Sequence, residues 1–125
     1  MLTRCKMTAM LPVVEMARAR KFYEGTLGLA PPTVRPNGEA RYGAGDVAFA
    51  LYPRSTPTRA DHTALSFEVK DLAAEMRDLR ARGVRFEEYD LPGLKTQAGV
   101  CVLGSEKAAW FKDTEGNVLC LHQDV

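Results

Sequence analysis

The fold is decided by the stretch Asp113-Thr-Glu-Gly-Asn-Val-Leu-Cys-Leu-His-Gln123. Aspartate, glycine and asparagine favour tight turns, and the mostly apolar residues that follow suit a strand. A second stretch, from Ala17 to Leu29, has apolar residues at spacings of three and four up to Gly28. This spacing predicts an amphipathic helix that ends at the glycine. The two stretches together predict a mixture of helix and sheet.

The sequence weakly repeats one order of elements, and this repeat sets the predicted architecture. We expect strands at residues 8–14, 33–35, 39–43 and 47–52 with a helix from 16 to about 27, the last two strands being joined at 44–46. The second half has predicted strands at 63–69, 84–89, 99–103, 108–112 and 118–122, with a helix that follows Asp71 and carries Leu72, Glu75, Met76, Leu79 and Arg82 on its inner face. We therefore predict one α+β domain over residues 1–125, with βαβββ modules at about 1–54 and 61–125 and a linker at about 53–60.

Composition and charge exclude several classes of protein. The chain has 125 residues and a net charge of +1, which offers no basic face for nucleic acid. It contains neither an apolar run long enough to span a bilayer nor the apolar stretch of a signal peptide. Three cysteines, with no C-x-x-C pair, argue against a disulfide framework and a zinc ribbon. We expect a cytoplasmic protein that binds neither nucleic acid nor membrane.

Strand parity predicts which side chains point away from the helices, because alternate residues of a strand face opposite ways. Leu65, Phe67 and Val69 are large and apolar and should face the helix. The opposite face then receives Thr8, Met10, Pro12 and Val14 from the first strand, His62, Ala64, Ser66 and Glu68 from the strand at 63–69, and Val118, Cys120 and His122 from the last. One of Trp110 and Phe111 must also point away from the core.

The order and separation of the two stretches resemble the vicinal oxygen chelate superfamily, which includes glyoxalase I, extradiol dioxygenases, fosfomycin-modifying enzymes and bleomycin-binding proteins. The resemblance implies two modules side by side, a curled mixed sheet with a cleft, and a homodimer. Metal-dependent members carry a histidine on each module's first strand and a glutamate on the last strand. Counted from Glu15, Asp71 and Gly116, these positions hold Thr8, Ala64 and Cys120.

These three residues cannot supply the converging imidazole and carboxylate ligands of a divalent cation, so we expect no cofactor. By resemblance to the bleomycin-resistance type, the cleft would bind a small organic molecule without transforming it. The predicted ligand-binding residues are Met10, Tyr52, Ala64, Trp110, Cys120 and His122. The hydroxyl of Tyr42 either reaches into the cleft or is hydrated at its rim, and residues 92–97 are a candidate lid.

Two alternatives stay open. One is an enzyme of the lyase, isomerase or dioxygenase type, which would use either no metal or a displaced divalent-metal site made of His62, Cys120 and His122, with Glu68 as the candidate general base. The other alternative is an interaction domain whose cleft is closed by its own side chains.

Overall fold

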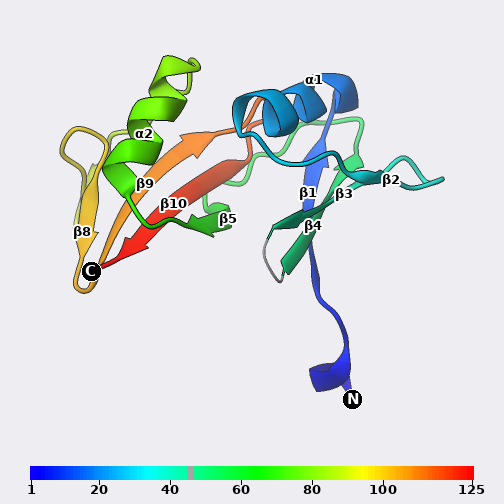
Figure 1. The fold of residues 1–125 in the computed structure, drawn as a ribbon, viewed down its shortest axis with the longest axis horizontal. Helices are drawn as coiled ribbons and strands as arrows, with labels where there is room; N and C mark the ends of the chain where they lie inside the picture. The colour runs from blue at the N-terminus through cyan, green and yellow to red at the C-terminus, as the bar shows by residue number, and fades with distance from the viewer. Residues whose placement is uncertain (45–46) are drawn as a thin grey trace. The chain divides into compact units, whose positions relative to one another are not determined.

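The computed structural model describes residues 1–44 and 47–125, and their contacts divide the chain into two compact units, residues 1–59 and 60–125. Each unit contains one four-stranded mixed sheet and one principal helix (Figure 1). The predicted α+β class is confirmed. The predicted connection at residues 44–46 includes Gly45 and Asp46, which lie outside the described residues.

The first unit has the predicted order of one strand, one helix and three strands. After a short helical turn (Leu2–Arg4) come β1 (Thr8–Val13), α1 (Met16–Lys21), β2 (Thr33–Val34), β3 (Ala40–Ala44) and β4 (Val47–Pro53). The strand order in the sheet is β1-β4-β3-β2, and β1 runs parallel to β4 while the other pairs are antiparallel. The first and last strands of the unit are therefore neighbours.

The helix of the first unit continues past α1 as a π-helical segment, Phe22–Thr26. The amide of Leu27 donates to the carbonyl of Phe22 at 2.9 Å, and Gly28 then adopts a φ of 76°. This positive φ favours glycine, which explains why the helix ends where the sequence predicts.

Three aromatic rings form the core of the first unit: Tyr23, Tyr42 and Phe49 lie with centroids 5.3 to 6.0 Å apart. The Tyr42 hydroxyl donates to Glu24 Oε2 at 2.8 Å, and Arg20 Nε donates to the same oxygen at 2.9 Å. Tyr42 is only 1% exposed, so the prediction that its hydroxyl lies in the cleft or at its rim was wrong. The charged pair on the helix instead satisfies the buried phenol.

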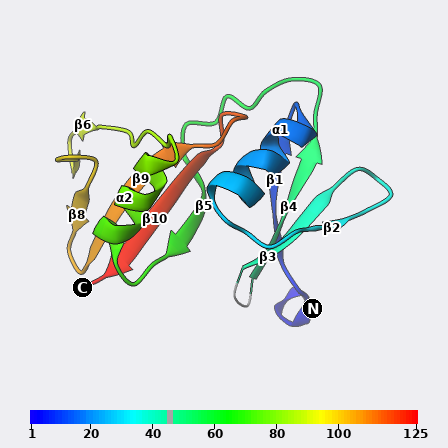
Figure 2. The same cartoon turned by 45° about the horizontal axis from the view of Figure 1, so that its top comes forward.

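The second unit repeats this plan and adds a hairpin. Its elements are β5 (Thr63–Glu68), α2 (Leu72–Ala81), the hairpin strands β6 (Asp90–Leu91) and β7 (Leu94–Lys95), β8 (Cys101–Leu103), β9 (Glu106–Lys112) and β10 (Val118–Asp124). The sheet order is β5-β10-β9-β8, with β5 parallel to β10. Figure 2 shows α2 beside β9 and β10.

Helix α2 begins as predicted, because Asp71 Oδ1 accepts a hydrogen bond from the Ala74 amide at 3.1 Å. Leu72, Met76 and Leu79 are buried, but Glu75 and Arg82 are exposed, so their predicted place on the inner face was wrong. Their charges remain in water, which avoids the cost of burying them.

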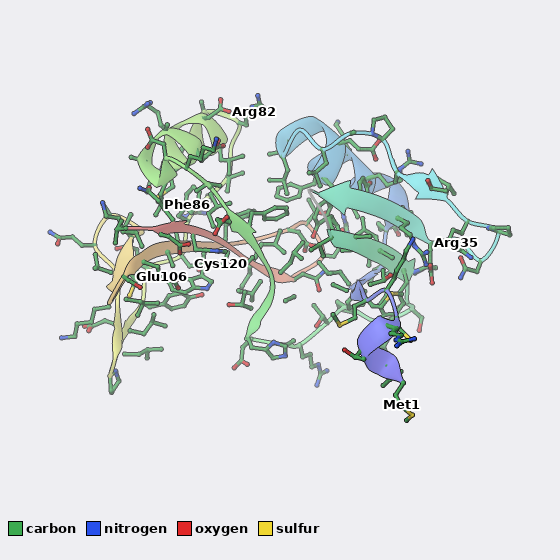
Figure 3. All side chains as sticks on the ribbon, turned by 60° about the horizontal axis from the view of Figure 1, so that its bottom comes forward. Met1, Arg35, Arg82, Phe86, Glu106 and Cys120 are labelled. Atoms are coloured by element: carbon green, nitrogen blue, oxygen red, sulfur yellow. The ribbon has the colours of Figure 1, made fainter. Side chains whose placement is uncertain are left out.

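The predicted strand at 84–89 was also wrong. Phe86, labelled in Figure 3, forms only an isolated bridge with Phe111 of β9. The chain then leaves the sheet for the β6–β7 hairpin, whose base is held by the Tyr89 amide donating to Thr96 Oγ1 at 2.7 Å. Residues 84–89 therefore connect α2 to the β6–β7 hairpin and do not form a strand of the sheet.

The turn before β10 is a closed hydrogen-bonded unit. Asp113 Oδ1 accepts from the amides of Glu115 and Asn117 at 2.8 and 2.9 Å, and Asn117 Nδ2 donates to Asp113 Oδ2 at 2.8 Å. Asp113, Glu115 and Asn117 are all buried, and Gly116 has a φ of 91°. The turn that the sequence predicts here therefore fixes where β10 starts.

No helix within the described residues is long and apolar enough to cross a membrane.

Candidate functional site

Three central strands of the second unit carry the candidate site. Cys120 of β10 is the register partner of Ser66 on β5 and of Trp110 on β9. Paired residues of neighbouring strands share a face, so these three side chains lie in one row. The opposite face carries Leu119, Leu121 and Phe111 under α2.

A bulge changes the first strand of this row. Thr63 pairs with Val118 and Leu65 with Leu119, so Ala64 is an extra residue in β5. The bulge brings Thr63 onto the face of the site, where its Oγ1 accepts a hydrogen bond of 3.0 Å from Trp110 Nε1. Parity alone had assigned His62 and Ala64 to this face and Thr63 to the other. His62 is exposed, with a ring nitrogen 3.4 Å from the Thr63 carbonyl oxygen.

An apolar cluster fills the middle of this face. It consists of Cys101, Ala108, Trp110, Val118 and Cys120. The partly buried side chains of Tyr89 and Leu94 pack against it from the hairpin region. Tyr89 meets Trp110 edge to face, with centroids 5.7 Å apart and an angle of 74° between the rings. Leu94 lies in the range 92–97 that was predicted as a candidate lid, whereas Tyr89 lies in the segment 84–89, whose alternation predicted a strand instead.

The chemistry of Cys120 follows from its burial. The side chain is 5% exposed and its Sγ contacts the Leu121 carbonyl oxygen at 3.4 Å. Burial raises the pKa of the thiol, partly offset by a hydrogen bond from Ser66, and the charge of Glu106 raises it further. Cys120 and Glu106 are labelled in Figure 3. The thiol is therefore protonated near neutral pH, which makes it a poor nucleophile and a poor metal ligand.

A polar group continues the row beyond Cys120. Ser66 Oγ lies 2.6 Å from His122 Nδ1, and His122 is the register partner of Glu68. Donor atoms of Glu68, His122 and Asp124 all lie within 4.8 Å of one another. Glu68 and Asp124 are exposed, and His122 is half-buried. Sequence reasoning named Glu68 and His122 but missed Asp124, although its position two residues after His122 places both on one face.

The predicted site residues of the first unit lie on β1 and β4. Tyr52 pairs with Pro12 and Met10 with Ala50, on the face opposite the buried Leu11 and Val13. Met10 is exposed and Tyr52 is half-buried. The parity predicted for the first strand therefore agrees with the register.

The family's metal positions can be tested by their donor atoms. Thr8 offers a hydroxyl, Ala64 offers no donor, and Cys120 offers a buried thiol whose pKa is raised. A divalent cation needs three or four converging carboxylate, imidazole or thiolate ligands. This donor set does not fit such a cation.

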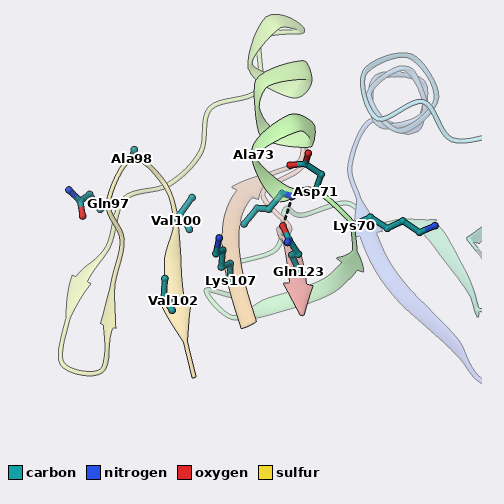
Figure 4. A pocket seen from close by; sticks show the side chains of 10 residues that line it. Lys70, Asp71, Ala73, Gln97, Ala98, Val100, Val102, Lys107 and Gln123 are labelled. Carbon is teal, nitrogen blue, oxygen red and sulfur yellow. Dashed lines mark hydrogen bonds between the residues drawn. The ribbon is translucent and has the colours of Figure 1, made fainter. Parts of the chain in front are cut away.

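A separate pocket of about 800 Å³ lies on the other side of the sheet (Figure 4). Lys107 and Gln123 are register partners in its floor, and Val100 and Val102 line the side near β8. Gln123 Oε1 accepts a hydrogen bond of 2.8 Å from the Leu72 amide at the start of α2. The glutamine thus satisfies a helix-end amide, which gives it a structural role.

Comparison with solved structures identifies the same fold. The chain is 20% identical to a glyoxalase/bleomycin resistance protein/dioxygenase superfamily member from Sphaerobacter thermophilus DSM 20745, with a TM-score of 0.76 over 99% of this chain and 100% of the other. It is 21% identical to TnmS3, an antibiotic-binding protein from Streptomyces sp. CB03234, with a TM-score of 0.66 over 98% of each chain. It is 11% identical to the fosfomycin resistance protein FosX from Listeria monocytogenes, solved with Mn(II) and sulfate, with a TM-score of 0.73 over 98% of this chain and 91% of FosX.

A search of curated protein sequences finds no match. The family model described as Glyoxalase/Bleomycin resistance protein/Dioxygenase superfamily matches residues 7–121. The match includes both modules and the turn before β10, so the chain belongs to the glyoxalase/bleomycin resistance protein/dioxygenase superfamily.

Proposed function

We propose that this protein binds a small, partly aromatic organic molecule on the Trp110–Cys120 face of its second unit, without a metal at the family positions. The observation that carries the proposal is Cys120: where metal-dependent relatives are expected to have a carboxylate, this chain has a buried, protonated thiol packed in an apolar cluster. Such a position favours apolar contact over metal ligation.

The composition of the face suits a ligand pocket, which combines apolar walls with a few placed polar groups. Trp110, Val118 and Cys120 supply the apolar surface. Ser66 and His122 supply a hydroxyl and an imidazole at its edge. TnmS3, an antibiotic-binding protein, has the same fold, so a binding role is compatible with this fold.

Access to this face depends on the hairpin. Trp110 is 9% exposed because Tyr89 and Leu94 pack against its cluster. The hairpin has a glycine at its tip, and the Asp90–Lys95 ion pair across it, at 3.8 Å, is largely exposed and therefore weak. We propose that the ligand displaces Tyr89 and Leu94 and stacks on the indole, so that the hairpin serves as the lid.

Trp110 is the only tryptophan, so its fluorescence reports on this face directly. The test is a titration of EDTA-treated protein with a panel of flat, partly apolar antibiotics and aromatic acids. Binding should change the Trp110 emission with a saturable dependence, and mass spectrometry should recover the ligand unchanged. Leu94→Ala should raise the association rate by opening the lid, while Leu91→Ala, at an exposed hairpin position, should not.

Two results would overturn the proposal. One is the absence of any saturable change in wild type and Leu94→Ala alike, which would favour an interaction domain whose face is closed by Tyr89 and Leu94. The other is chemical conversion of a bound compound only after a divalent metal is added, which would favour an enzyme. The group of Glu68, His122 and Asp124 is the specific observation behind that second candidate function.

A further inference from the structure

The end of β10 gathers three metal-ligating side chains that the family positions do not include. Glu68 on β5 and His122 on β10 are register partners, and Asp124 follows two residues later on the same strand. The row therefore contains one imidazole and two carboxylates from two adjacent parallel strands. Its donor atoms lie within 4.8 Å of one another.

This spacing is close to what one bound cation requires. A transition-metal ion at about 2.1 Å from each nitrogen or oxygen donor places the donors roughly 3 to 3.5 Å apart. Glu68 and Asp124 are exposed side chains with free rotamers, so rotation about their χ angles can close the remaining distance. The strand backbones need not move.

One ring nitrogen of His122 is already held by a hydrogen-bond contact. Ser66 Oγ contacts His122 Nδ1 at 2.6 Å, and Nε2 has no hydrogen-bond partner among the described residues. A histidine that binds a metal nearly always has its other ring nitrogen held by a hydrogen bond, which fixes the ring and the tautomer. Ser66 sits one pleat before Glu68 on β5 and supplies this contact.

Space for water or a further ligand lies beside the two carboxylates, at the ends of β5 and β10. A hollow of about 420 Å³ is lined by Glu68, Val69, Lys70, Gln123 and Asp124. One imidazole and two carboxylates leave open coordination positions, which this space would fill with water or an exogenous anion. Lys70 adds a positive charge beside the two carboxylates, so the local charge is not purely acidic.

We propose that Glu68, His122 and Asp124 bind one divalent first-row transition-metal cation, such as Zn²⁺ or Mn²⁺, with Ser66 as a positioning residue for His122. The mixed nitrogen and oxygen donors favour such ions over Mg²⁺, which prefers oxygen ligands and keeps its water. The site lies wholly within the second unit and is distinct from Thr8, Ala64 and Cys120. It does not depend on the proposed organic ligand.

The test uses untagged full-length protein, stripped with chelator and titrated with Zn²⁺ by calorimetry and with Mn²⁺ by electron paramagnetic resonance. We expect one equivalent to bind, with Mg²⁺ competing only at large excess. Glu68→Gln, His122→Asn and Asp124→Asn should each weaken binding by roughly tenfold or more.

Matched controls come from the same chain. His62→Asn removes the other histidine, and Glu88→Gln removes an exposed carboxylate on the way to the hairpin; neither should change the affinity. Ser66→Ala should weaken binding by about 10- to 100-fold. Ser66→Thr, which keeps the hydroxyl, should restore binding, and this rescue separates positioning from ligation. Circular dichroism of each variant shows that it is folded.

Binding below one equivalent for both metals, or binding that survives His122→Asn and is lost in His62→Asn, would overturn the site. The Trp110 titration with organic compounds in EDTA gives an independent answer on the proposed function. Failure of one proposal therefore leaves the other standing.

Discussion

Trp110 and Thr63, 47 residues apart in sequence, are joined by a hydrogen bond of 3.0 Å from the indole nitrogen to the threonine hydroxyl. The bond spans from β9 to β5, on either side of β10. It restrains the ring of Trp110, the only tryptophan in the chain. The fluorescence of Trp110 therefore reports on changes at this face.

Removing this bond should loosen the indole. Thr63→Val keeps the shape but leaves the Trp110 nitrogen without its acceptor, so we expect a loss of about 1 kcal/mol in the free energy of unfolding. The emission maximum should shift to the red as water reaches the ring. Urea unfolding followed by fluorescence measures both. Thr33→Val, on the exposed strand β2, is the control and should be nearly neutral.

Cysteine reactivity should follow burial. Cys5 is exposed, whereas Cys120 is buried and the pKa of its thiol is raised. At mildly alkaline pH, iodoacetamide should label Cys5 faster than Cys120 by roughly tenfold or more, because only the thiolate reacts. Peptide mass spectrometry over time gives the two rates. Equal rates would show that the cluster around Cys120 is open to solvent.

The stability of the first unit should fall at alkaline pH. Burial, and then the hydrogen bond to Glu24, raise the pKa of Tyr42 above its usual 10.0. The unfolded chain therefore loses the phenolic proton first, and the free energy of unfolding decreases as pH rises above about 10. Tyr42→Phe should lower stability near neutrality by about 1 kcal/mol and reduce its decline at high pH.

Denaturant unfolding at about pH 8 and about pH 10.5 tests this expectation. Tyr52→Phe is the matched control, since Tyr52 is only half-buried on β4. A decline as steep in Tyr42→Phe as in wild type would assign the effect to other groups.

Two glycines with nearly equal φ angles differ in the space around them, so alanine substitutions at the two positions distinguish the cost of backbone strain from the cost of steric crowding. Gly93 and Gly99 have φ values of 77° and 81°, but a Cβ at Gly99 would lie 3.1 Å from Met76 Cε and 3.2 Å from Phe86 Cβ, whereas one at Gly93 meets nothing within 4 Å. Gly93→Ala should cost about 1 kcal/mol from the backbone alone. Gly99→Ala should cost a further 1 to 3 kcal/mol, roughly, from overpacking. Thermal unfolding of both variants measures the difference, and equal costs would contradict it.

We expect the protein to form a homodimer. Met10, Val34 and Val47 are large apolar side chains of the first unit's sheet and are 46 to 59% exposed. Met10 lies on one face of this sheet and Val34 and Val47 on the other, and a two-fold dimer, the commonest assembly, would bury some of these side chains. Light scattering should give twice the chain mass of 13.8 kDa. A mass that stays at that of one chain at all concentrations would contradict this prediction.

Local signals explain what could be predicted from the sequence. The turn from Asp113 to Asn117 closes through its own side chains, and Asp71 caps α2 by bonding three residues ahead. Both depend on neighbours in the chain, so residue type and spacing were sufficient. The parity of β10 was right for the same reason, since it needed only the alternation of Leu119 and Leu121.

Long-range pairing explains what could not be predicted. The bulge at Ala64 arises from the way β5 pairs with β10, and no residue type in β5 predicts it. The contribution of Tyr89 to the cover of the Trp110 cluster was missed, because the chain stops pairing with β9 after the bridge at Phe86, although the lid predicted at 92–97 includes Leu94. The placement of Asp124 beside Glu68 likewise depends on two strands more than 50 residues apart.

Because β5 contains an extra residue, the side chains that reach the site depend on how β5 is aligned with β10 as well as on the residue types in β5. With Ala64 looped out, a hydroxyl from Thr63 meets the indole; in a regular strand, parity would present the imidazole of His62 and a methyl group instead. A relative that gained or lost one codon at this point would exchange these groups while every neighbouring residue stayed the same. Insertions and deletions at the entrance to this strand are therefore a route to new specificity that substitution tables do not record.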